Sequence, residues 1–167
     1  MIHQFEKTFA EPRDESISIL PDVEIELDAP PVRVAPGIYA AECLKITKVE
    51  RREWRRWYWQ FLLRLRGVGP ENGVILHAFV NVPRTGKLSA YSKLGRWTRI
   101  IAAYTGARAN RVSMRSFGQF LFTVKVETVR TANSGKKPFP LPEAAQYEIV
   151  SEILDIVGRL TQRAGNQ

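Results

Sequence analysis

The segment RREWRRWYWQFLLRLRG, residues 51–67, contains six arginines and three tryptophans. In an extended strand, successive side chains point to opposite faces. From residue 57 one face would carry Trp57, Trp59, Phe61, Leu63 and Leu65, and the other Tyr58, Gln60, Leu62, Arg64 and Arg66. We therefore expect residues 56–67 to form a β-strand with an apolar face in the core and a basic face at the surface.

Three further segments have the composition of strands, because they are rich in β-branched and aromatic residues. They are residues 37–50, 74–82 and 119–129. In residues 74–82 the alternation separates an aliphatic face from a mixed face that includes His77 and Phe79. In residues 119–129 the inward side chains are expected to be Phe120, Phe122, Val124 and Val126.

A helix is predicted between the third and fourth of these strands, after a loop at residues 83–91. Its apolar residues recur at helical spacing, and they are Leu94, Trp97, Ile101 and Tyr104. Ser92 or Ser89 would cap its start, and Gly106 would end it.

The last third of the chain is harder to assign. Residues 111–118 suit a short helical turn, and residues 130–142 read as a long, basic, flexible loop. Residues 146–158 mix a strand-like YEIV with apolar residues at helical spacing, so we expect a strand that passes into a helix.

Three strands, a helix and two more strands are the order of an OB-fold, a five-stranded barrel with a helix between strands three and four. That fold binds single-stranded nucleic acid across strands two and three and the adjoining loops. The fold class predicted is therefore mostly β, with an acidic extended leader before the barrel.

Charge is distributed unevenly along the chain. Residues 1–30 carry a net charge of −6 and the remainder +14, which gives +8 overall. We divide the chain into an acidic leader at 1–35, a binding domain at 36–158 and a flexible tail at 159–167. A strongly basic domain favours a polyanionic partner, most often nucleic acid.

Several segments of the chain also have the layout of a known group of proteins. They are PGIYAAECLKITKVE, WYWQFLLRLRG, GVILHAFVNV, KLGRWTRIIAAYTG, GQFLFTVKVET and YEIVSEILDI. From about residue 36 to 157 the chain resembles the small OB-fold single-stranded DNA-binding proteins of phages, plasmids and other mobile elements. The resemblance implies sequence-nonspecific binding of single-stranded DNA in replication or recombination. In that group an acidic tail usually lies at the C-terminus, whereas here the acidic residues precede the domain.

Aromatic rings that stack on bases and cations that follow the phosphates hold single strands. Trp54 is the first stacking candidate, because burying it would desolvate four neighbouring arginines. Trp57, Trp59 and Trp97 are assigned to the core. The predicted nucleic-acid-binding residues are Arg51, Arg52, Trp54, Arg55, Arg56, Tyr58, Arg64, Arg66, His77, Phe79, Lys125, Arg130, Lys136 and Lys137.

Catalysis is not expected, and neither is a metal or a cofactor. The chain has two histidines and one cysteine, Cys43, and 8 of its 17 carboxylates lie in the leader, outside the domain. The segment TGKLS lacks the serine or threonine that a phosphate-binding loop needs after its lysine. The single cysteine and the absence of a signal-peptide pattern predict a cytoplasmic protein.

Three alternatives stay open at this stage. The barrel could bind RNA, or it could be a protein-interaction module whose aromatic strand packs on a partner. Self-association through a barrel edge is a further option. The segment DVEIELD in the leader is either a solvated tail or a ligand for the chain's own basic groove or for a partner protein.

Overall fold

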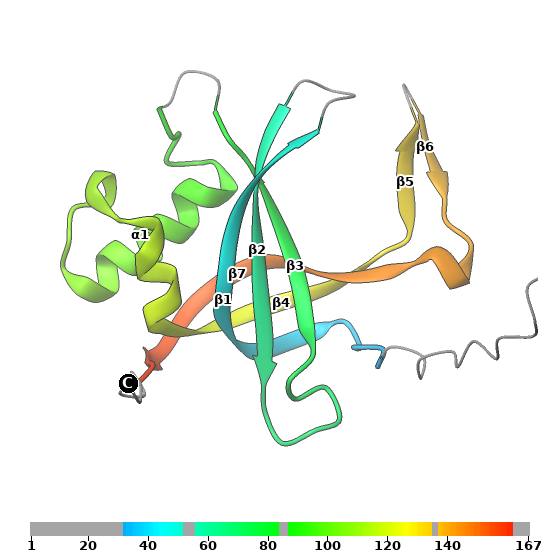
Figure 1. Ribbon diagram of the computed structural model, residues 1–167, viewed down its shortest axis with the longest axis horizontal. Helices are drawn as coiled ribbons and strands as arrows, with labels where there is room; N and C mark the ends of the chain where they lie inside the picture. The colour runs from blue at the N-terminus through cyan, green and yellow to red at the C-terminus, as the bar shows by residue number, and fades with distance from the viewer. Residues whose placement is uncertain (1–31, 52–55, 84–86, 135–136, 162–167) are drawn as a thin grey trace, which may run out of the picture. The chain divides into compact units, whose positions relative to one another are not determined.

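A computed structural model of the chain describes residues 32–51, 56–83, 87–134 and 137–161 (Figure 1). Within these ranges the chain is mostly β, as predicted. The main strands are β1 (Gly37–Arg51), β2 (Arg56–Arg66), β3 (Ile75–Asn81), β4 (Phe120–Val129) and β7 (Tyr147–Arg159). The other elements are the helix α1 (Lys93–Thr105), the 3-10 turns η2 (Ala109–Arg111), η3 (Met114–Gln119) and η4 (Glu143–Ala145), and the short strands β5 (Thr131–Ser134) and β6 (Lys137–Pro140).

The five main strands form one mixed sheet in the order β1-β2-β3-β7-β4. Because β4 also pairs with β1, the order returns to its first strand and the sheet closes as a barrel. All neighbours are antiparallel except β3 and β7, which meet in parallel at His77 and Ile149. In Figure 1, β1, β2 and β3 lie in front and β4 and β7 cross behind them. The expected five strands, with a helix between the third and fourth, are confirmed.

The β1–β2 ribbon is longer than the barrel that it helps to close. β1 pairs with β2 from Ala40 to Arg51, but with β4 only from Gly37 to Glu42. An irregularity between Cys43 and Lys45 marks the change. Beyond Ile46 and its partner Phe61, the ribbon therefore extends past β4, and we call this part the projecting half.

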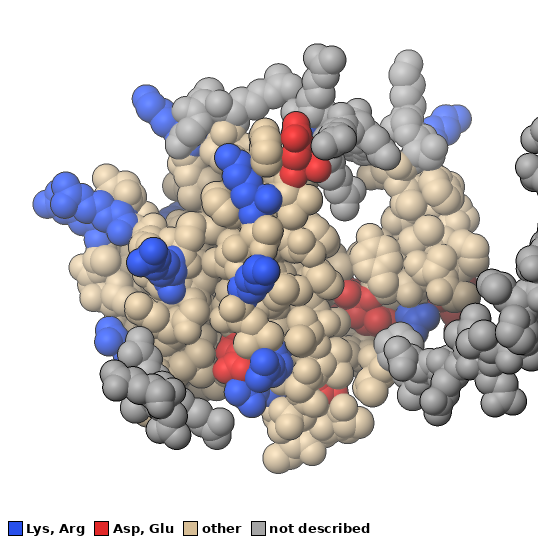
Figure 2. All heavy atoms as spheres, viewed as in Figure 1, with Lys and Arg blue, Asp and Glu red and all other residues tan. Residues whose placement is uncertain are grey.

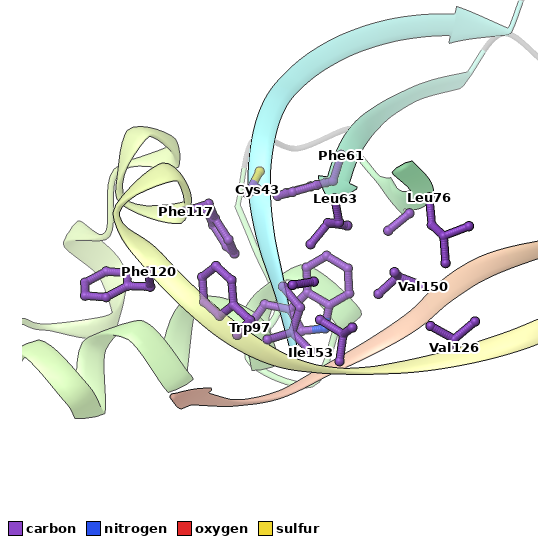
Figure 3. Close-up of a cluster of buried hydrophobic side chains, with 14 of the residues drawn as sticks. Cys43, Phe61, Leu63, Leu76, Trp97, Phe117, Phe120, Val126, Val150 and Ile153 are labelled. Atoms are coloured by element: carbon purple, nitrogen blue, oxygen red, sulfur yellow. The ribbon is translucent and has the colours of Figure 1, made fainter. Parts of the chain in front are cut away.

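The core fills the barrel and the space beneath α1 and η3 (Figure 3). Phe61 of β2 is fully buried, and its ring meets Trp97 of α1 at 5.3 Å and Phe117 of η3 at 5.1 Å, both edge to face. The predicted inward residues of β4 are also buried, from Phe120 to Val126. The alternation read from the sequence is therefore confirmed for the barrel part of these strands.

The ends of α1 lie where they were predicted. The Ser92 hydroxyl accepts a hydrogen bond from the Gly95 amide at 3.0 Å, and Gly106 ends the helix with a φ of 71°. A Cβ added at Gly95 would lie 2.0 Å from the carbonyl oxygen of Ser89, so the helix packs tightly on the loop before it. No helix in the described ranges is long and apolar enough to cross a bilayer.

The predicted passage of the last strand into a helix is wrong, because β7 is extended over its whole length. Val150, Ile153 and Ile156 face the core although they are three residues apart. They stand opposite Val126, Val124 and Phe122, which are two apart, so the extra residues of β7 are taken up in bulges. These bulges produce an apolar spacing that looks helical.

The predicted flexible loop at residues 130–142 is also wrong in part, because β5 and β6 pair as a hairpin. Pro138 and Pro140 lack an amide hydrogen, which a two-stranded ribbon tolerates. Arg33 lies against the segment that follows the hairpin. Its guanidinium donates to the carbonyl oxygens of Glu143 and Gln146 and to the Glu148 carboxylate, at 2.9–3.1 Å.

Candidate nucleic-acid interface

The registers of β1, β2 and β3 define rows of neighbouring side chains that point away from the barrel core. We call the surface that these rows form the outer face. Each row crosses the three strands in the order β1, β2, β3. The rows are Val49–Tyr58–Asn81, Thr47–Gln60–Phe79, Lys45–Leu62–His77 and Glu42–Arg64–Ile75.

The first three rows form a partly exposed aromatic surface. Tyr58 and Phe79 are half-buried, and His77 is exposed. The His77 and Phe79 rings are nearly parallel, with centroids 6.1 Å apart and an interplanar angle of 8°. The Gln60 amide nitrogen lies 2.7 Å from His77 Nδ1. Three predicted binding residues from two strands are thus brought onto one surface.

The support beneath this surface comes from α1. Lys93 Nζ lies 3.4 Å from the Phe79 carbonyl oxygen and 5.1 Å from the centroid of the Trp97 ring. Burial is the main cause that lowers the pKa of Lys93, with Arg96 adding to it and Glu152 opposing it. The Trp97 indole donates to Glu152, which also pairs with Arg96 at 2.6 Å. Arg96 is therefore part of the link between α1 and β7.

The outer face is basic. Lys45 and Arg56 are exposed, and Glu42 is the single acidic residue in the four rows described above. Figure 2 views the molecule from this side and shows lysine and arginine side chains along it, with acidic side chains at its edges. The exposed cations therefore favour an anionic partner near Arg56 at one end of β2 and near Lys45 on β1.

Arg64 and Arg66 do not stand alone on this face. Both guanidiniums pair with Glu42 Oε1, at 3.5 and 2.8 Å, and that carboxylate is largely buried. The sequence placed both arginines on the outward face, and the structure confirms this, but Glu42 engages them at one end of it.

The assignment of Trp57 to the core is wrong. Its side chain is 43% exposed, because it lies on the part of the ribbon that extends beyond β4. Lys48 Nζ lies over its ring, 4.8 Å from the centroid. Trp59, two residues closer to the barrel, packs against the core as expected and is partly buried.

The remaining predicted residues are dispersed. Lys125 lies on β4, away from the outer face, and pairs with Glu127 at 2.7 Å, which is the main cause that lowers the pKa of that carboxyl. Arg130 and Lys137 are exposed at the β5–β6 hairpin. Arg51 pairs through its backbone with Arg56 at the end of the ribbon. Arg52, Trp54, Arg55 and Lys136 lie outside the described residues.

Sequence reasoning missed two exposed residues, one on the β5–β6 hairpin and one on the outer face. Phe139 on β6 is 44% exposed and lies opposite Ala132 in the hairpin. Its segment KPFP was taken for a loop, so no strand pattern drew attention to it. Lys45 follows the irregularity in β1, which reverses the simple alternation there, so only the register with Leu62 reveals its outward position.

Among the residues that the structure describes, no group of three or more acidic, histidine or cysteine side chains could hold a metal ion. No family model matches this sequence, and neither a curated protein nor a solved structure matches it significantly. The geometry of the outer face is therefore the basis for the functional argument.

Proposed function

We propose that the barrel is an OB-fold and that its outer face binds single-stranded DNA without regard to sequence, in the replication or recombination of a phage, plasmid or other mobile element. The observation that carries the proposal is the joint placement of Tyr58, His77 and Phe79 with Lys45 and Arg56 on β1, β2 and β3. An OB-fold binds oligonucleotides on the corresponding strands, and the strand order and the position of α1 agree with that fold.

Binding would combine stacking with phosphate attraction. Bases would stack on the aromatic side chains, at about 1–3 kcal/mol for each base by alanine substitution. Phosphates would follow Lys45 and Arg56 along the edge of the same surface. Stacking is sequence-tolerant because every base presents a π-face, so these side chains suit binding without sequence preference.

Two connections would flank the bound strand. In an OB-fold the loops between strands one and two and between strands four and five border the binding surface. Here the first connection joins β1 to β2, and the second contains the β5–β6 hairpin with Arg130, Lys137 and Phe139. Figure 1 shows the hairpin rising on the same side of the barrel as the projecting ends of β1 and β2.

The test is a titration of fluorescent oligo-dT of about thirty nucleotides, longer than the usual OB-fold site, at several salt concentrations. Duplex DNA and RNA of equal length are the competitors. We expect salt-sensitive binding that prefers the DNA single strand and that Tyr58→Ala and Phe79→Ala each weaken about fivefold or more. Tyr91→Ala is the matched control, because Tyr91 is 85% exposed in the loop before α1.

Each outcome separates the candidate functions. Equal competition by duplex DNA would contradict the proposal and leave a general polyanion surface. Preference for RNA would assign the same face to RNA. No binding would favour a protein-interaction module, in which the aromatic side chains meet a partner protein.

A further inference from the structure

A second basic feature lies where the outer face ends. Beyond the Lys45–Leu62–His77 row, a pocket of about 810 Å³ opens between β1, β2 and the end of β7. Its polar lining consists of Glu42, Arg64, Arg66, Gln119, Arg159 and Thr161. The binding-site prediction from the sequence included Arg64 and Arg66, but neither Arg159 nor the pocket.

The charges in this pocket do not balance. Three arginines line it, and Glu42 is its one acidic side chain among the described residues. The carboxylate pairs with Arg64 and Arg66, so it holds two guanidiniums in place while leaving a net charge of +2. The side chains of Arg64 and Arg66 are still 38% and 47% exposed. Guanidiniums fixed in this way are well suited to bind a phosphate.

Arg159 is positioned independently of Glu42. It is the last residue of β7, where its backbone pairs with Phe120, and its guanidinium lies 5.8 Å from the centroid of that ring. The Leu160 amide donates to the Gln119 carbonyl oxygen at 2.8 Å, which fastens the end of β7 beside η3. Gln119 and Thr161 add neutral hydrogen-bonding groups to the same pocket.

The pocket is continuous with the outer face. Arg64 lies in the row after Leu62 and His77, so it belongs both to the outer face and to the pocket. From Arg56 to Arg66 the eleven residues of β2 span about 33 Å at the usual rise for a strand. A DNA strand that follows β2 from the projecting end would reach the pocket with its backbone.

We propose that this pocket binds a backbone phosphate of the single strand and so extends the binding path from the aromatic rows to the end of β7. The inference rests on the proposed function. Arg159 and Arg66 bind the phosphate, and Glu42 both orients the arginines and repels the phosphate. Removing the positive and the negative side chain should therefore change affinity in opposite directions.

The experiment uses the full chain and oligo-dT of two lengths, about thirty and about five nucleotides, the shorter being near the lower limit of an OB-fold site. Arg159→Gln should weaken binding of the longer strand about three- to tenfold and lower its salt slope by about 0.7, the contribution of one phosphate contact. The short strand should be affected less, because the aromatic rows alone can hold it. Glu42→Gln should tighten binding of the longer strand.

Two control variants separate a specific role of Arg159 from a general effect of charge. Arg111→Gln removes the same charge from η2, where Arg111 is exposed outside the pocket. Arg159→Lys keeps the charge and should retain most of the affinity. Circular dichroism and thermal unfolding of every variant show whether it is folded. If Glu42→Gln does not fold, the comparison of Arg159→Gln with Arg159→Lys still tests the pocket.

The outcomes separate the pocket from the proposed function. If the wild-type chain binds oligo-dT and Arg159→Gln behaves like Arg111→Gln, the pocket is an ion-paired structural cluster and the inference fails while the function stands. If Glu42→Gln is folded and weakens binding, the inference fails in the same way. If the wild-type chain does not bind single-stranded DNA, both proposals fail together.

Discussion

The two halves of the β1–β2 ribbon belong to the same pair of strands but have different surroundings. In the half within the barrel, β1 pairs with β2 and, up to Glu42, also with β4, and Phe61 and Leu63 are fully buried. In the projecting half, β1 pairs only with β2 among the described residues, and Trp57 is exposed beside Lys48. Phe61 and Trp57 occupy alternate positions on the same side of β2, yet one is a core residue and the other a surface residue.

On the inner side of the β1–β2 ribbon, residues that stabilise the fold and residues available for binding thus lie in different halves. Apolar side chains in the barrel half contribute to the free energy of unfolding, because the core surrounds them. Side chains in the projecting half have little core behind them, so evolution can change them with less effect on folding. We expect each half to respond differently to the same kind of substitution.

The largest effect should come from Phe61→Ala. Removing a fully buried aromatic ring that packs on Trp97 and Phe117 should lower the free energy of unfolding by about 3–5 kcal/mol. Trp57→Ala should lower it by about 1 kcal/mol or less, because that ring is exposed. Urea unfolding followed by circular dichroism measures both, and equal losses would contradict the division of the ribbon.

Cys43 lies at the irregularity in β1, within the barrel half, and burial raises the pKa of its thiol from 9.0 to about 12. In the unfolded chain the thiol ionises at lower pH than in the folded chain. The free energy of unfolding should therefore fall as the pH rises from about 9 towards 12. Urea unfolding at several pH values should show a shallower fall in Cys43→Ala. An identical pH dependence in both proteins would refute this assignment.

Deleting residues 1–30 should have a smaller effect, confined to binding. The deletion removes a net charge of −6 from a chain whose remainder carries +14. If the segment DVEIELD competes for the basic face, affinity for oligo-dT should rise several-fold at low salt and the gain should vanish at high salt. The titration described above measures this. Unchanged affinity at low salt would leave the leader as a solvated tail or a site for a partner protein.

The smallest effect should come from the Lys48–Trp57 contact in the projecting half. An exposed cation–π pair contributes about 0.5–1 kcal/mol. A double-mutant cycle of Lys48→Gln and Trp57→Leu, measured by urea unfolding, should give a coupling energy of that size. A coupling near zero would mean that the two side chains of this contact contribute to stability independently.

Local patterns predicted much of this fold. The alternation in β2, β3 and β4 placed their inward residues correctly except Trp57, and Ser92 and Gly106 marked the ends of α1. These patterns predict the structure correctly because each depends only on residues a few positions apart in the sequence. The helical spacing of Ile149, Ile153, Ile156 and Leu160 misled because bulges in β7 change the period of a strand, and bulges depend on pairing with β4.

The candidate site could be predicted less completely, for a similar reason. The alternation of side chains shows which side of β2 a residue occupies, but it does not show where the barrel ends. Trp57 was therefore assigned to the core. The pairing of Glu42 with Arg64 and Arg66 depends on the β1–β2 register. The role of Arg159 depends on the position of the end of β7. The binding roles of the named side chains stay predictions.

The closing pairs of the barrel have a consequence for how the chain folds. β1, β2 and β3 pair with their neighbours in sequence, whereas closure joins Gly37 to Val126 and His77 to Ile149. Contacts between residues far apart in sequence form slowly, because a long loop must be ordered first. The three strands that carry the outer face can thus associate early, during synthesis, while closure waits for β7. A nascent chain would expose the inner side of this sheet until its last strand arrives, and that interval is when it is most prone to aggregate.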